Sequence, residues 1–144
     1  MSRRSRGREV ALQLLYQREQ NARIDRAALE HFASDRLKET GIRTFCWLLF
    51  DGIVANLQEI DAKISAAAEN WKLSRMPAVD RNILRIGAFE LLFMKDTPPA
   101  VAFDEAIELA RRFGTADSSA FINGVLDRLR REAEPAKKED QPAP

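Results

Sequence analysis

Apolar residues recur every three or four positions along most of this chain, a spacing that is typical of amphipathic α-helices. The first such segment runs from Arg6 to Asn21, and its apolar positions are Val10, Ala11, Leu14 and Leu15. No segment shows the strict alternation of apolar and polar residues that marks a half-buried β-strand. The pattern therefore predicts an all-α fold.

Residues that favour helix ends divide the first half of the chain. Asp25 is a good N-cap for a second helix, because its carboxylate can accept a hydrogen bond from the first turn. Gly41 is expected to interrupt the chain before a buried, aromatic-rich helix over Phe45–Val54. Asn56, followed three residues later by an acid, resembles a capping box, so we expect a break there. The next helix should continue as far as Trp71.

Prolines and a glycine mark the helices of the second half. Pro77 suits the first turn of a helix over Val79–Met94, because the missing N–H is not needed at that position. A further helix runs through Ala102–Phe113 and is expected to end at Gly114, a residue type that is favoured just after a helix. Two helices are therefore predicted between residues 77 and 114.

The end of the chain is predicted to hold one more helix and then a tail. Either Asp117 or Ser118 can cap this last helix. Residues 134–144 combine charged residues with three prolines, which predicts a disordered tail. A chain of 144 residues has room for one domain, which we expect over residues 1–133. The whole pattern predicts about seven helices.

The charge of the chain is nearly balanced, but it is unevenly distributed. Lys and Arg number 23, Asp and Glu number 22, and the net charge is +1. Residues 1–8 hold four arginines and no acid, and subtracting these four charges leaves −3 for the remainder. Cations at a helix N-terminus oppose the helix dipole, whereas a bound polyanion would relieve that conflict. Nucleic-acid binding and a loose, arginine-rich tail both remain open.

Two aromatic residues are candidate platforms for unstacked bases, as a site that reads single-stranded RNA requires. Tyr16 lies on the first predicted helix and Phe121 on the last. Either ring could instead belong to the core.

Catalytic and metal-binding patterns are absent from the sequence. The single cysteine, Cys46, and the single histidine, His31, exclude an intrachain disulfide, a cysteine zinc site and a histidine-rich metal site. We expect Cys46 to be buried, because it lies in an apolar run. The scattered glycines form no phosphate-binding loop. We therefore expect no catalytic residues, metal or cofactor, and no enzyme activity.

No apolar stretch is long enough to span a membrane, and the basic N-terminus is not followed by the apolar core of a secretory signal. We therefore expect a soluble cytoplasmic protein.

Four segments, in order and at compatible spacing, carry a family pattern. They are Arg4–Glu9 with Ala11–Tyr16, then Val79–Leu91, then Glu105–Ala110 with Phe113-Gly114, and finally Phe121–Asp127. Over roughly residues 3–130 the chain resembles the NusB family of transcription antitermination factors. The resemblance implies two packed helical subdomains, roughly residues 1–72 and 73–133.

The resemblance also implies a function. NusB pairs with NusE, a ribosomal protein of the small subunit, and the pair binds the boxA element of nascent RNA. That complex joins other Nus factors on RNA polymerase and supports antitermination, notably on ribosomal RNA operons. The resemblance leaves open whether the chain forms a homodimer through its RNA-facing surface.

Carried over position by position, the resemblance implies RNA-binding roles for Arg4, Arg6, Arg8, Tyr16, Asp80, Arg85, Asp117 and Phe121. The three arginines would contact phosphates and base edges, Phe121 would stack on a base, and Asp117 would accept a base hydrogen bond. Asp80 and Arg85 would lie near the RNA and NusE surfaces. Glu90, in contrast, is expected to be a structural carboxylate on a buried stripe.

Three positions depart from the family pattern. Ser5 interrupts an arginine run, Phe89 stands where a tyrosine is common, and Asp104 stands where an amide is common.

Two other functions remain as alternatives. One is a stand-alone RNA-targeting domain related to the N-terminal part of ribosomal RNA methyltransferases. The other is a purely protein–protein helical adaptor whose arginines form a solubilising tail.

Overall fold

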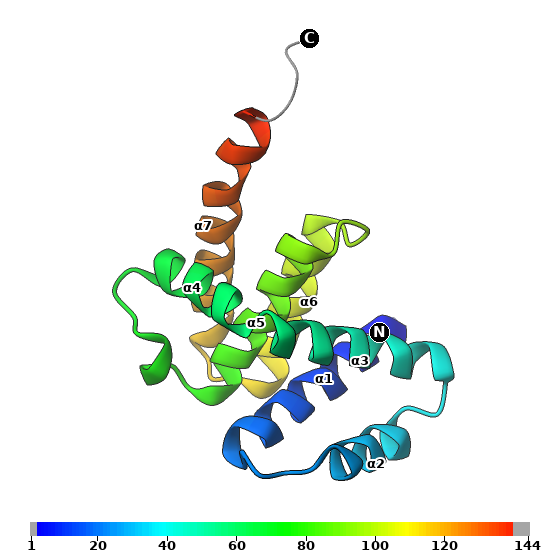
Figure 1. The fold of residues 1–144 in the computed structure, drawn as a ribbon. Helices are drawn as coiled ribbons and strands as arrows, with labels where there is room; N and C mark the ends of the chain where they lie inside the picture. Colours follow the sequence, from blue (N-terminus) through cyan, green and yellow to red (C-terminus); the bar gives the residue numbers. More distant parts are fainter. Residues whose placement is uncertain (1–2, 140–144) are drawn as a thin grey trace.

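The computed structural model describes the backbone of residues 3–139 and the side chains of residues 3–133. The described residues form seven α-helices and one short 3-10 helix, with no strand, so the predicted all-α fold is confirmed (Figure 1). The elements are α1 Arg3–Gln20, α2 Arg26–Arg36, α3 Thr40–Ala55, α4 Leu57–Ala68, η1 Leu73–Arg75, α5 Ala78–Phe93, α6 Pro99–Phe113 and α7 Ser118–Glu139.

The starts of α2 and α1 differ in how well the sequence predicts them. The N-cap at Asp25 is confirmed, because its carboxylate accepts a hydrogen bond of 2.9 Å from the backbone N–H of Ala28. Helix α1 begins at Arg3, before the predicted start at Arg6, so the arginines belong to the helix itself. The cationic side chains are therefore held in helical register and do not form a loose tail.

The prediction of an interruption at Gly41 is wrong. Gly41 lies in the first turn of α3, where glycine costs only about 1 kcal/mol relative to alanine. Burial of the apolar face of α3 outweighs that cost. The break at Asn56 is confirmed, but the capping box is not. The side-chain amide of Asn56 donates to the carbonyl of Gly52 at 2.8 Å and does not cap α4.

Helix α4 ends at Ala68, so the prediction that it continues to Trp71 is wrong. Glu69 adopts φ of 40°, the only positive φ among the non-glycine residues that the structure describes, and this backbone conformation turns the chain out of the helix. The backbone N–H of Trp71 then donates to the carbonyl of Ala68 at 3.1 Å. Trp71 therefore lies in a tight turn rather than on a helix face.

The turn between α6 and α7 is unusually close. Gly114 ends α6 as predicted, but its φ of −93° is not the left-handed conformation of a typical C′ glycine. The requirement for glycine is steric, because an added Cβ would lie 2.5 Å from Oγ and 2.6 Å from Cβ of Ser118. Helix α7 runs past the predicted boundary at residue 133 to Glu139, and residues 140–144 lie outside the described residues.

Helix α5 lies in the middle of the bundle and packs against α1, α3, α4, α6 and α7 (Figure 1). One contiguous core takes buried side chains from all seven α-helices of the described chain. Cys46 is part of this core, as predicted, and burial raises the pKa of its thiol to about 12, with a smaller contribution from the charge of Asp51. Within residues 3–139, no helix is long and apolar enough to cross a bilayer.

Helices α1 and α5 run antiparallel and are tied together at both ends. At the start of α1, Arg8 donates from Nε and Nη2 to the carboxylate of Glu90, at distances of 2.7–3.0 Å. At the end of α1, Glu19 accepts a hydrogen bond of 2.7 Å from the amide of Asn82. Arg8 and Glu90 are 2% and 1% exposed, which confirms the structural carboxylate expected at Glu90.

Replacing Arg8 with alanine leaves Glu90 as a buried carboxylate without its cation, so we expect the free energy of unfolding to fall by about 3–5 kcal/mol. Urea denaturation followed by circular dichroism measures this loss. Arg6→Ala is the matched control, because the Arg6 side chain is 43% exposed, and its loss should stay within about 1 kcal/mol. Equal, small losses for both variants would contradict a structural role for the Arg8–Glu90 pair.

Candidate nucleic-acid interface

The predicted RNA-binding residues lie at both ends of the antiparallel pair α1 and α5. Arg4, Arg6 and Arg8 lie at the start of α1, beside the C-terminal end of α5. Asp80 lies at the other end of α5. Its distance from Glu90 along the helix is roughly 15 Å, at about 1.5 Å per residue. The structure therefore separates the arginines from the predicted carboxylate and aromatic positions.

The three arginines of the motif differ in their surroundings. Arg4 is exposed, and its guanidinium lies 4.6 Å from the ring centroid of Phe45. Arg6 is partly exposed and forms an ion pair of 3.0 Å with Glu9. The phosphate contact implied for Arg8 does not fit its position, because its guanidinium is buried against Glu90. Arg4 and Arg6 are thus the arginines of the motif that face the surface.

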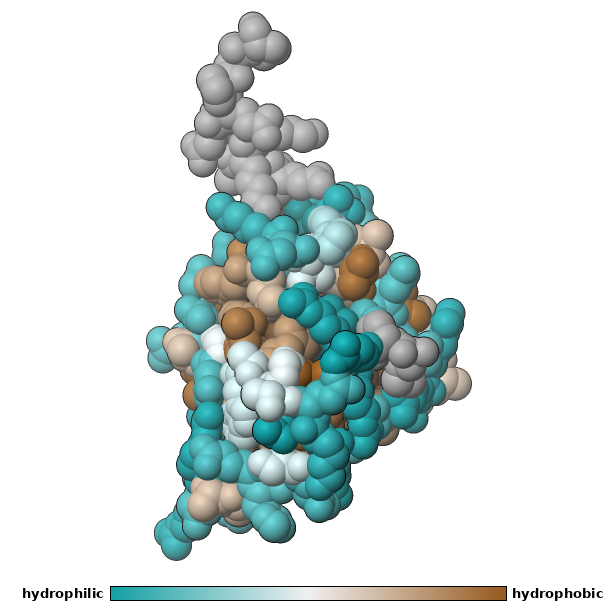
Figure 2. All heavy atoms as spheres, turned by 90° about the vertical axis from the view of Figure 1, so that its right-hand side faces the viewer, coloured by the Kyte–Doolittle hydropathy of each residue, from teal (hydrophilic) through white to brown (hydrophobic). Residues whose placement is uncertain are grey.

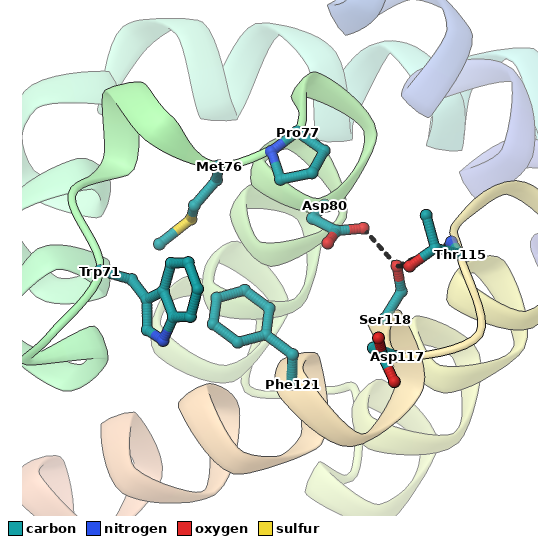
Figure 3. Close-up of a pocket in the computed structure, with 8 residues that line it drawn as sticks. All are labelled: Trp71, Met76, Pro77, Asp80, Thr115, Asp117, Ser118 and Phe121. Carbon is teal, nitrogen blue, oxygen red and sulfur yellow. Dashed lines mark hydrogen bonds between the residues drawn. The ribbon is translucent and has the colours of Figure 1, made fainter.

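A pocket of about 300 Å³ gathers three of the predicted residues at the N-terminal end of α5 (Figure 3). It is formed by the segment before α5, by α5 itself, by the turn that leads into α7 and by the start of α7. Asp80, Asp117 and Phe121 all line it, although they come from two different helices and a turn. Sequence reasoning did not assign Trp71 to the site, but its ring lies 5.9 Å from that of Phe121 in an edge-on arrangement.

The polar side of the pocket is organised by Ser118, which sequence reasoning considered only as a helix cap. Its hydroxyl accepts a hydrogen bond of 2.9 Å from the backbone N–H of Thr115 and donates one of 2.8 Å to Asp80. Asp80 is 6% exposed and lies in the first turn of α5, where the helix dipole favours a carboxylate. Asp117 is exposed at the rim.

Arg85 and Tyr16 lie outside this pocket. Arg85 donates from Nε and Nη2 to Asp61 on α4 at 2.8 and 2.9 Å, and it also lies 3.5 Å from Glu19 on α1. It therefore ties three helices together. Tyr16 lines a neighbouring groove between α1 and α2, together with Phe113 at the end of α6.

A chain of charged side chains extends from the start of α1 to the last turn of α6. Glu9 binds Arg6 at 3.0 Å and Arg112 at 3.2 Å. Arg112 lies in the last turn of α6, just before the turn that carries Asp117. The contact between Glu9 and Arg112 spans 103 positions of sequence, so no local signal could have indicated it.

Exposed apolar side chains also occur away from the pocket. Leu48, Phe93 and Val101 are exposed, and Figure 2 shows one face on which apolar side chains gather within a hydrophilic rim. Exposed apolar side chains therefore do not distinguish the pocket from other parts of the surface. Its distinguishing feature is the pairing of two aromatic rings with a nearly buried carboxylate. Among the described residues, no group of three or more His, Cys, Asp or Glu side chains is arranged to hold a metal ion.

The sequence matches known proteins over most of its length. The sequence profile of the NusB family matches residues 5–131. The transcription antitermination protein NusB of Geobacter sulfurreducens is 46% identical over 132 residues, covering 90% of this chain and 94% of that protein. The same protein of Desulforapulum autotrophicum is 44% identical over 133 residues, covering 90% of this chain and 92% of that protein.

Solved structures show the same fold. T. maritima NusB superimposes with a TM-score of 0.82 at 39% sequence identity, covering 98% of this chain and 99% of that one. A crystal structure of the antitermination factors NusB and NusE in complex with dsRNA contains a chain with a TM-score of 0.83 at 25% identity. That match covers 92% of this chain and 98% of the other.

Ser118→Ala removes the hydroxyl that links Asp80 to the backbone of Thr115. Because Asp80 is nearly buried, we expect the free energy of unfolding to fall by about 1–3 kcal/mol. The midpoint and slope of urea denaturation measure the change. Ser119→Ala, one residue further along α7 and partly exposed, is the matched control and should change stability by less than about 0.5 kcal/mol. If both variants kept wild-type stability, the hydrogen bond would not organise the pocket.

Proposed function

This chain belongs to the NusB family, and on that premise we propose that it is a transcription antitermination factor that binds boxA RNA together with NusE. One observation supports the proposal that the chain binds RNA. Arg6 at the start of α1 and Arg112 in the last turn of α6 share an ion-pair partner, Glu9, and the turn that follows α6 lines a pocket with aromatic walls. Phosphate contacts supply affinity, and contacts with unstacked bases supply selectivity.

Each part of this surface has a chemical role in the proposal. Arg4, Arg6 and Arg112 bind phosphates, because guanidinium groups pair with phosphate oxygens through two parallel hydrogen bonds. Phe121 stacks on a base, and Asp117, exposed at the rim, accepts a hydrogen bond from a base edge. Arg8 and Arg85 act indirectly by holding the helices that carry these groups.

The charge balance supports a partner-dependent mode of binding. The net charge is +1, and Arg6, Arg8, Arg85 and Arg112 each lie in an ion pair with a carboxylate of the chain. The electrostatic attraction to RNA is therefore modest, and the chain alone should bind RNA weakly. A second protein that adds contacts raises both affinity and selectivity. The relative in complex with NusE and dsRNA supports NusE as that partner.

The remaining parts of the proposal follow from the family. The chain acts as a non-catalytic adaptor in the cytoplasm, where it joins other Nus factors on RNA polymerase and supports transcription of ribosomal RNA operons.

A titration of boxA RNA against a scrambled RNA of equal length, with and without NusE, tests this function. We expect weak binding by the chain alone, and tighter binding that favours boxA when NusE is present, because base contacts then add to phosphate contacts. Fluorescence anisotropy measures both affinities. Equal affinity for the two RNAs in the presence of NusE would contradict the proposed boxA selectivity, and no binding to either RNA would favour a protein–protein adaptor.

The double variant Arg4→Ala, Arg6→Ala tests the proposed phosphate contacts. Each phosphate neutralised on a single strand contributes about 0.7 to the slope of log affinity against log salt concentration. Loss of two contacts should therefore lower the magnitude of that slope by about 1.4. The control, Arg23→Ala with Lys63→Ala, removes two exposed cations from other surfaces and should leave the slope nearly unchanged. The same slope in both double variants would rule out these phosphate contacts.

A further inference from the structure

Arg6 and Arg112 meet on a single carboxylate, although they come from distant parts of the sequence. Nη1 of Arg6 lies 3.0 Å from Oε2 of Glu9. Arg112 donates from Nη1 to the same Oε2 and from Nη2 to Oε1, both at 3.2 Å. Two donors that reach one oxygen atom can also reach one phosphate group, because hydrogen bonds from guanidinium to phosphate have similar lengths, about 2.7–2.9 Å.

The cluster of Arg6, Glu9 and Arg112 presents its cations to the solvent and keeps its anion inside. The Glu9 side chain is 7% exposed, whereas those of Arg6 and Arg112 are 43% and 34% exposed. A phosphate that approaches from the solvent therefore meets guanidinium groups, and the carboxylate lies behind them.

The guanidinium of Arg112 is also held by an aromatic ring. It lies 4.9 Å from the ring centroid of Phe113. Phe113 lines the groove beside α1 that also contains Gln13 and Tyr16. These two residues follow Glu9 by four and seven positions, so they share its face of α1. The cluster is thus preorganised at one end of a continuous face, which limits the entropy that binding would cost.

The charge of the cluster depends on both arginines. Two guanidinium groups and one carboxylate leave one net positive charge, which attracts a phosphate. Removal of either arginine leaves one cation paired with Glu9 and no net charge. The cluster should therefore attract a phosphate only when both cations are present.

From these features we propose that Arg6, Glu9 and Arg112 form one clamp for a single phosphate of the RNA backbone. The two arginines bind this phosphate between α1 and α6, and Glu9 is a positioning residue that brings them together. The inference rests on the proposed RNA-binding function, which assigns a phosphate contact to each arginine. It adds that the two arginines share one phosphate and that neither binds it alone.

A scan of the RNA backbone tests whether the phosphate is shared. In a boxA RNA, each phosphate in turn is replaced by an uncharged methylphosphonate, with the neighbouring sugar hydroxyl blocked as a methyl ether. Each RNA is titrated, in the presence of NusE, against the wild-type chain, Arg6→Ala and Arg112→Ala. For the wild type we expect a loss of affinity of roughly tenfold at the clamped phosphate. In both variants the loss at that same position should disappear.

Arg111→Ala is the matched control for the backbone scan. It removes an exposed cation from the same last turn of α6, one position before Arg112. It should keep the wild-type loss of affinity at the clamped phosphate. Circular dichroism verifies that the variants are folded, which we expect because each arginine variant keeps one cation on Glu9.

Restoration of the charge tests the role of Glu9. In Arg112→Ala the remaining pair of Arg6 and Glu9 has no net charge, so the slope of log affinity against log salt concentration should fall in magnitude by about 0.7. Adding Glu9→Gln returns one net positive charge and should restore most of that slope. If Glu9 were only structural, its replacement would leave the slope low. Adding Glu30→Gln instead makes the same charge change on α2 and should restore nothing.

The outcomes separate this inference from the proposed function. If the two arginine variants lose sensitivity at different positions, or if neither does, the clamp is overturned while the RNA-binding function stands. If Glu9→Gln does not restore the slope, the positioning role of Glu9 is overturned. If the wild-type chain with NusE binds none of the RNAs, both the clamp and the proposed function fail. If Arg112→Ala weakens the association with NusE in the absence of RNA, the cluster is a protein contact and the inference is overturned.

Discussion

The buried ion pair between Arg8 and Glu90 is the interaction on which the rest of the arrangement depends. Two charges taken out of water are stable only when their geometry is good and their other hydrogen-bonding groups are satisfied. Both conditions hold, because Arg8 donates through two nitrogens to Glu90 and also lies 3.6 Å from Glu105 on α6. Ser5 donates to the same Glu105 at 2.6 Å. The start of α1 is thereby fixed between α5 and α6.

The fixed position of the start of α1 determines which arginine side chains reach the surface. With Arg8 inside, Arg4 and Arg6 project outward, and the buried carboxylate of Glu9 pairs with both Arg6 and Arg112, at the end of α6. The antiparallel course of α1 and α5 places the aromatic pocket at the other end, next to the turn between α6 and α7. In the proposed function, phosphate contacts and base contacts come from different ends of one surface, in keeping with a near-neutral chain that binds RNA with a partner.

Much of the fold could be predicted from the sequence, because periodicity and caps are local properties. The all-α class, the cap at Asp25 and the break at Asn56 follow from residues within one or two helical turns. The end of α4 is not predicted, because the positive φ of Glu69 has no sequence signal. The site was less predictable. The burial of the Arg8 side chain depends on Glu90, which lies 82 positions away in the sequence. The hydrogen bond between Ser118 and Asp80 spans 38 positions. Such pairings are properties of the packed structure.

In the proposed complex, RNA contacts the outward arginines and the aromatic pocket while Arg8 stays inside. NMR spectra of the isotope-labelled chain with NusE, recorded with and without boxA RNA, test it most directly. We expect the amide signals of residues 3–7 and 114–122 to shift on RNA binding, while the Nε–H signal of Arg8 stays in place. Shifts confined to α2 and α4, or a clear change of the Arg8 Nε–H signal, would contradict it.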